Sequence, residues 1–154
     1  MSNKPRFVYT TYIQTTQEKL WDALTNGEFT RQYWSGYRIE SDWRLGSPLK
    51  FYDADGVLRH SDHVVKAERP KFLSYTWKPL HEGMPDESAS TVNFEIENMG
   101  SYVKLTVTHF DFAEDSKIFP MISGGWPLVL SSLKSFLESN KPMNWKKCGG
   151  GNEK

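Results

Sequence analysis

The alternation of apolar and polar residues near the start of the chain predicts one strand followed by two short helices. Residues 7–14, FVYTTYIQ, alternate with period two and are rich in β-branched and aromatic residues, which is typical of a strand. Thr15 followed by Glu18 matches a capping box, so a helix should begin there and end at residues 26–27, Asn-Gly. Apolar residues four apart predict a second short helix over residues 28–33.

The pattern then changes to period two and predicts a run of antiparallel strands. Gly-, Pro-, Asp- and Asn-containing turns separate the apolar stretches, and the connections are short enough for hairpins. Clean alternation in two of the strands indicates a sheet with one dry face and one wet face. The six predicted strands are residues 37–43, 49–53, 60–68, 72–78, 90–97 and 102–110.

Residues 118–137 are apolar at helical spacing and should supply the helix that covers the dry face of the sheet. Gly124, Gly125 and Pro127 interrupt this stretch without changing its phase. We therefore predict two nearly collinear helical segments, the second restarting at Trp126 with Pro127 in its first turn. The two glycines should absorb a kink and leave space on the face that contacts the sheet.

Composition favours one intracellular domain. The chain has 154 residues, 19 basic and 19 acidic, so no net charge attracts nucleic acid. The start of the chain has no apolar signal segment, and no stretch is long and apolar enough to span a membrane. The single cysteine, Cys148, excludes an internal disulfide and a thiolate metal cluster. We expect a cytoplasmic protein with one domain over residues 1–140.

Residues 141–154 are polar and glycine-rich, which predicts a C-terminal tail. The basic stretch 141–147 contains Trp145 and is interpreted as solvated, with contact to a partner as the alternative. The aromatic content is high, at 14% of residues with six tryptophans, which suits either a packed core or a pocket.

Five segments in this order resemble the START-like superfamily, also called SRPBCC, and within it the activator of Hsp90 ATPase homologue family. The resemblance covers residues 7–140. It rests on TQEKLWDAL (16–24), SDWRLGSPLKF (41–51), ERPKFLSYTW (68–77), LTVTHFDF (105–112) and GWPLVLSSLKSFL (125–137). The resemblance implies an α+β helix-grip fold, in which a curved antiparallel sheet of about seven strands wraps around a long C-terminal helix.

The resemblance also implies a cavity between the sheet and the helix that takes apolar or aromatic small molecules. Strand parity and helix phase select the side chains that would line it. The predicted ligand-binding residues are Trp34, Phe51, Tyr75, Trp77, Phe94, Val107, His109, Met121, Trp126 and Leu130. We do not expect the activator's separate N-terminal chaperone-binding domain before the first strand, and this expectation argues against a chaperone-stimulating role.

Sequence motifs for metal or cofactor chemistry are missing. After His81-Glu82, Pro85 stands where a zincin helix needs its second histidine, and His60 and His63 should point to opposite faces of a strand. The chain has no nucleophile elbow, P-loop or dinucleotide fingerprint. We therefore predict no metal, no cofactor and no assigned catalytic residue.

His109 faces the covered side of its strand, and Asp111 could orient its ring. It is either a polar anchor for a ligand or a buried histidine bonded to its neighbours. Our main hypothesis is a small-molecule-binding protein that is not an enzyme. The alternatives are a chaperone or stress-response regulator that acts through protein contacts, and a cyclase or hydrolase that uses His109.

Overall fold

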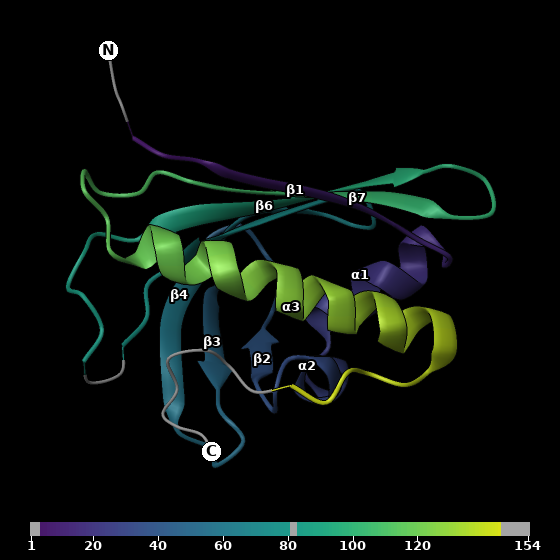
Figure 1. Cartoon of the computed structure of the whole chain (residues 1–154), viewed down its shortest axis with the longest axis horizontal. Helices are drawn as coiled ribbons and strands as arrows, with labels where there is room; N and C mark the ends of the chain where they lie inside the picture. The colour runs from purple at the N-terminus through teal and green to yellow at the C-terminus, as the bar shows by residue number, and fades with distance from the viewer. Residues whose placement is uncertain (1–3, 81–82, 146–154) are drawn as a thin grey trace.

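A seven-stranded antiparallel sheet and one long helix form the framework of the computed structural model (Figure 1). The structure describes residues 4–80 and 83–145. The elements in chain order are β1 (Phe7–Ile13), α1 (Gln17–Thr25), α2 (Gly27–Tyr33), β2 (Arg38–Ser41), β3 (Pro48–Tyr52), β4 (Leu58–Glu68), β5 (Phe72–Trp77), β6 (Ser90–Asn98), β7 (Val103–Phe110) and α3 (Ile118–Ser139). This architecture confirms the predicted helix-grip fold.

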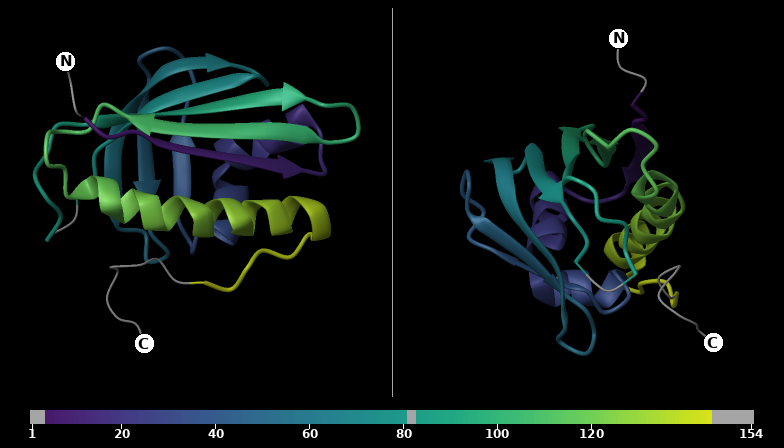
Figure 2. Two further views of the ribbon diagram at one scale, coloured as in Figure 1. Left: turned by 45° about the horizontal axis from the view of Figure 1, so that its top comes forward. Right: turned by 90° about the vertical axis from the view of Figure 1, so that its left-hand side faces the viewer.

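The sheet has the strand order β1-β7-β6-β5-β4-β3-β2. Strands β2 to β6 each pair with the strand that follows in sequence, so the predicted hairpins are confirmed. β1 pairs with β7, with Phe7 opposite His109 and Ile13 opposite Val103. The sheet curves around α3, which lies along its open side (Figure 2).

The dry face of the sheet carries the apolar members of the alternating pattern and packs against α3. Each of the buried apolar side chains on β6 and β7 is at most 3% exposed. They are Val92, Phe94, Ile96, Val103, Leu105 and Val107. The inward row of α3 keeps the helical phase that we predicted and consists of Ile118, Ile122, Trp126, Val129, Leu130, Leu133 and Phe136.

The first helix begins one residue later than the capping-box pattern predicts. Thr16, not Thr15, is the N-cap, and its hydroxyl accepts a hydrogen bond from the Lys19 amide at 3.2 Å. The amide of Thr15 instead donates to the carbonyl of Ile13, which extends the turn after β1. Two adjacent threonines can both cap a helix, so the sequence alone does not choose between them.

Two expectations for the last helix are wrong. α3 is one continuous helix from Ile118 to Ser139 with Pro127 inside it, and does not restart at Trp126. Gly124 does not leave space beneath the helix. A Cβ at either position would have no heavy atom within 4 Å outside the nearby helix backbone, and Gly124 is exposed. Because Ile122 and Trp126 both face the sheet, Gly124, two residues after Ile122, points away from it.

Alanine at Gly124 or Gly125 is expected to stabilise the protein. Each change should raise the free energy of unfolding by about 0.5–1 kcal/mol, because glycine costs that much in a helix interior and the methyl group meets open space. Urea unfolding of the two variants would measure it. Gly27→Ala is the control with the opposite sign, since its Cβ would lie 2.6 Å from the Ile39 carbonyl oxygen. Destabilisation by Gly124→Ala would contradict the outward orientation.

Candidate functional site

Five large rings meet between the sheet and α3, and we call them the aromatic cluster: Trp34, Phe51, Trp77, Phe94 and Trp126. Trp77 on β5 is central. Its ring centroid lies 5.3 Å from that of Trp126 and 5.7 Å from that of Phe51. Trp34, which follows α2, contacts Trp77 and Trp126 at 6.3 and 5.5 Å. Side chains from five parts of the chain therefore share one apolar interior.

The structure brings nine of the ten predicted ligand-binding residues into this interior. Tyr75 joins the cluster through ring contacts with Phe51 and Phe94, and Val107 and Leu130 are buried in the same core. Met121 does not belong with them, because it is 41% exposed. It precedes the inward-facing Ile122 by one residue and is therefore turned about 100° away from the sheet. The placement of Met121 beneath the helix is wrong.

His109 is fully buried and uses both ring nitrogens. The Trp126 indole N–H donates to Nδ1 at 3.0 Å, so Nδ1 is an acceptor, and Nε2 lies 2.8 Å from the Ser90 hydroxyl. The neutral tautomer with the proton on Nε2 satisfies both bonds. Burial, followed by repulsion from His60, lowers the pKa of His109 to about 3. His109 is therefore neutral at pH 7, and both of its ring nitrogens form hydrogen bonds within the protein.

Asp111 does not orient the His109 ring, contrary to expectation. β7 ends at Phe110, and Asp111 adopts a positive φ of 65° on the exposed turn that follows. The alternation that places Val107 and His109 on one face therefore does not extend to Asp111. Ser90 and Trp126 hold the ring instead.

A second buried polar group lies beside Trp77, and the sequence analysis missed it. His60 Nδ1 is 3.3 Å from Asp62 Oδ2, and both side chains are 1% exposed. The other carboxylate oxygen of Asp62 accepts a bond from the Thr76 hydroxyl at 2.7 Å. The His60 ring lies 4.4 Å from Trp77. His60, Asp62 and Val64 alternate along β4, and this pattern could have placed His60 and Asp62 on the same face. From the sequence we considered His60 only as a metal ligand.

Metal-ligating side chains do not gather in groups of three or more within residues 4–80 and 83–145. His60 is buried and His63 is exposed on the opposite face of β4, as predicted. His81, Glu82 and Cys148 lie outside the described residues.

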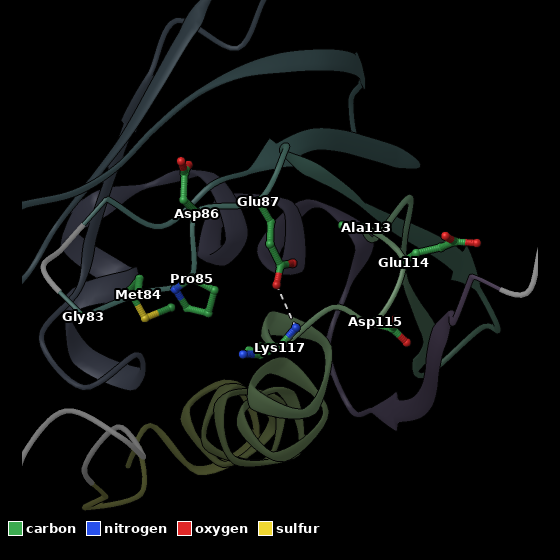
Figure 3. A pocket seen from close by; sticks show the side chains of 9 residues that line it. All are labelled: Gly83, Met84, Pro85, Asp86, Glu87, Ala113, Glu114, Asp115 and Lys117. Carbon is green, nitrogen blue, oxygen red and sulfur yellow. Dashed lines mark hydrogen bonds between the residues drawn. The ribbon is translucent and has the colours of Figure 1, made fainter.

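A surface hollow of about 630 Å³ lies where the β5–β6 connection meets the start of α3 (Figure 3). Glu87 points onto the first turn of α3, whereas Asp86 and Glu114 point away from it. The nine lining residues are Gly83, Met84, Pro85, Asp86, Glu87, Ala113, Glu114, Asp115 and Lys117. The hollow thus lies at the end of α3 where the helix begins, and both charged and apolar residues line it.

Glu87 ties the β5–β6 connection to α3. Its carboxylate accepts hydrogen bonds from the Ser116 hydroxyl and the Lys117 amide, each at 2.7 Å. The Ser116 hydroxyl oxygen in turn accepts from the Ile118 and Phe119 amides at 3.1 Å. Glu87 and Ser116 together satisfy amides that have no partner within the first turn of a helix.

Glu87→Ala is expected to lower the free energy of unfolding by about 1–2 kcal/mol, because it removes this cap from α3. Urea unfolding would measure the loss, and amide exchange should increase in the first turn of α3. Asp86→Ala is the matched control. Asp86 forms an ion pair with Lys78, but the Asp86 side chain is fully exposed. The change should therefore have no measurable effect on the free energy of unfolding. Equal effects of the two variants would contradict the capping role.

Residues 141–145 pack against the domain, whereas we had interpreted this stretch as solvated. The Trp145 indole N–H donates to the Tyr33 carbonyl at 3.0 Å, and the Ser35 hydroxyl donates to the Trp145 carbonyl. The Met143 amide donates to the buried Ser132 hydroxyl at 3.0 Å. The contacts of Trp145 stabilise the start of the tail. Residues 146–154 lie outside the described part of the chain.

Helices that could cross a membrane are not found in the described part of the chain. A family model described as activator of Hsp90 ATPase homolog 1-like protein matches residues 14–138. The chain belongs to this family.

This AHSA1-like chain also resembles solved structures with 18–22% sequence identity, which shows a shared fold. The Aha1 dimer from Colwellia psychrerythraea is 22% identical with a TM-score of 0.72, covering 89% of this chain and 98% of that one. An HSP90 activator from Plasmodium falciparum is 20% identical with a TM-score of 0.68, covering 86% and 95%. CalU16 from Micromonospora echinospora is 18% identical with a TM-score of 0.69, covering 91% and 78%. Among curated proteins, none matches the chain.

Proposed function

We propose that this AHSA1-like protein binds a small, largely apolar or aromatic molecule between the sheet and α3. The observation that carries the proposal is the aromatic cluster around Trp77, which offers flat apolar surface from β3, β5, β6, α3 and the segment after α2. Binding sites for small molecules are lined mainly by such side chains, with a few polar groups that fix orientation.

The ligand must be mostly uncharged. His109 is neutral, and the Asp62 carboxylate already accepts bonds from Thr76 and from the Lys78 amide. A charged ligand group would lose its hydration without gaining a free partner of opposite charge. His109 and Ser90 are the polar groups nearest to Trp126 and would orient a ligand that carries one hydrogen-bonding group.

The hollow at the start of α3 supplies the proposed route of entry. Ring contacts lead inward from this end of the helix, from Phe119 to Phe112 at 5.2 Å and from Phe112 to His109 at 4.6 Å. His109 then contacts Trp77 at 5.5 Å. Because the rings of the interior touch one another, a ligand has to displace part of the aromatic cluster when it binds.

Protein NMR with a library of lipids and aromatic metabolites would test the proposal. A ligand should shift the indole N–H signals of Trp77 and Trp126. Trp126→Phe should weaken binding, whereas Met121→Ala, on the outer face of the same helix, should leave it unchanged. The proposal fails if no compound shifts the signals of Trp77 or Trp126.

A chaperone regulator that acts by protein contact is the second candidate, and family membership together with the Plasmodium falciparum HSP90 activator favours it. It predicts a stoichiometric complex with an Hsp90 chaperone and a changed ATPase rate. An unchanged rate and no complex would exclude it.

A cyclase or hydrolase that depends on His109 has the least support. A pKa of about 3 makes His109 a weak base at pH 7, and both of its ring nitrogens are engaged by Ser90 and Trp126. Once a substrate is known, unchanged turnover by His109→Ala would exclude this role.

A further inference from the structure

The outer face of the sheet, on the side away from α3, carries a second hollow of about 300 Å³. It extends across β4, β5, β6 and the end of β7. A register shift between Val64 and Lys66 leaves Val65 as an extra residue in β4 opposite β5, and this bulge raises one side of the hollow. The lining residues are Val65, Lys66, Phe72, Ser74, Thr91, Asn93, Phe110 and Asp111.

The floor of the outer hollow contains polar side chains that form no hydrogen bond to another described residue. Ser74 is only 3% exposed, yet its hydroxyl forms no hydrogen bond to any other residue of the described chain. Asn93 lies directly opposite Ser74 in the β5–β6 register, and its side-chain amide also has no partner among the described residues. Thr91 on the same face of β6 adds a third such group. Buried polar groups normally find partners, so this floor is suited to a ligand that supplies them.

The walls of the outer hollow are apolar and aromatic. The rings of Phe72 and Phe110 both line it, and each has a cation beside its face. Lys66 Nζ lies 5.5 Å from the Phe72 centroid and Arg6 Cζ lies 6.0 Å from the Phe110 centroid. Lys66 and Asp111 are the two charged residues in the lining, and their opposite signs leave it without net charge.

We propose that the outer hollow binds a small neutral molecule with one flat apolar ring and one amide or hydroxyl group. The ring would lie between Phe72 and Phe110, and the polar group would exchange hydrogen bonds with Ser74 and Asn93. The volume is at the lower end of that of small-molecule sites. Ser74 is only 3% exposed, so a compact ligand reaches its hydroxyl more readily than a peptide backbone does. This site is separate from the proposed interior site.

Benzamide is a suitable test compound because it has one ring and one amide. In an NMR titration of the whole chain, it should shift the amide signals of Thr91, Asn93 and Phe110 and leave the Trp126 indole unchanged. Ser74→Ala should weaken binding about fivefold or more, as expected for the loss of one hydrogen bond. Thr106→Ala, on the same face of the sheet but outside the lining, should bind benzamide like the wild type.

Stability gives an independent readout. Because the Ser74 hydroxyl has no hydrogen-bond partner within residues 4–80 and 83–145, Ser74→Ala should keep or raise the midpoint of urea unfolding. A lower midpoint would mean that the hydroxyl stabilises the fold, and would overturn the proposal. Unchanged benzamide affinity in Ser74→Ala, equal affinity for toluene, or no shifts at the outer hollow would overturn it as well. If the library screen finds no ligand for the interior site, the benzamide and unfolding results still decide the proposal for the outer hollow.

Discussion

Replacing Trp126 by alanine is expected to lower the free energy of unfolding by about 3–5 kcal/mol, the cost typical of removing a buried aromatic side chain. Trp126 contacts Trp34, Trp77 and Phe94 through its ring, and its indole N–H donates to His109. Its removal leaves a cavity in the aromatic cluster and an unsatisfied Nδ1 on His109. Urea unfolding followed by circular dichroism would measure the loss.

Two further variants separate the causes. Trp126→Phe keeps most of the ring contacts but removes the donor to His109, and should cost about 1–3 kcal/mol. Met121→Ala, on the exposed side of α3, should change stability by less than about 0.5 kcal/mol. If Trp126→Ala cost no more than Met121→Ala, the inward position of Trp126 would be wrong.

Acid should destabilise the protein through His109 by about 3 kcal/mol between pH 7 and pH 4. The pKa of His109 falls from 6.5 to about 3 on folding, mainly because the ring is buried. Between these two values the unfolded chain binds a proton that the folded protein does not, so protons favour unfolding. The contribution is complete above pH 6.5 and is lost as the pH falls toward 3, at about 1.4 kcal/mol per unit. Urea midpoints across this range would measure it.

His109→Gln is the control for the acid effect. Glutamine does not titrate, but its amide can accept from Trp126 and donate to Ser90. The variant should therefore lose less stability than the wild type between pH 7 and pH 4, even if it is less stable at pH 7. The same acid sensitivity in both proteins would show that the effect does not come from His109.

The sequence was sufficient to predict the fold because its strongest signals are local. Period-two alternation in β6 and β7 placed Phe94, Val107 and His109 on the inner face, and all three are buried. The unbroken helical phase of α3 likewise placed Trp126 inside. Burial of apolar side chains dominates folding, so these patterns survive in the tertiary structure.

The errors concern groups whose place depends on tertiary contacts or on a single backbone turn. The partner of His109 is Ser90, 19 residues away on the neighbouring strand, and no local pattern identifies it. Asp111 lies beyond the end of β7, where alternation no longer applies. Gly124 was assigned to the wrong face, because the two adjacent glycines were interpreted as a break in a helix that is continuous.

The outer hollow was also beyond the sequence analysis. Ser74 alternates correctly onto the wet face, where a hydroxyl is expected to meet water. It nevertheless is only 3% exposed, and it shares the lining of the outer hollow with Phe72, Phe110 and Val65, the extra residue of the bulge in β4. A bulge depends on the pairing of two strands, so the sequence of one strand does not predict it.

The pairing of β1 with β7 has a consequence for the order in which the protein forms. Strands β2 to β7 pair with their sequence neighbours. β1 instead pairs with β7 at the other end of the sequence, with Phe7 opposite His109. Closing so long a loop costs more entropy than closing a hairpin and slows folding. We expect the six-strand meander to form first, with β1 joining when the chain that follows it is almost complete. During synthesis on the ribosome, the first strand made would therefore be the last to enter the sheet.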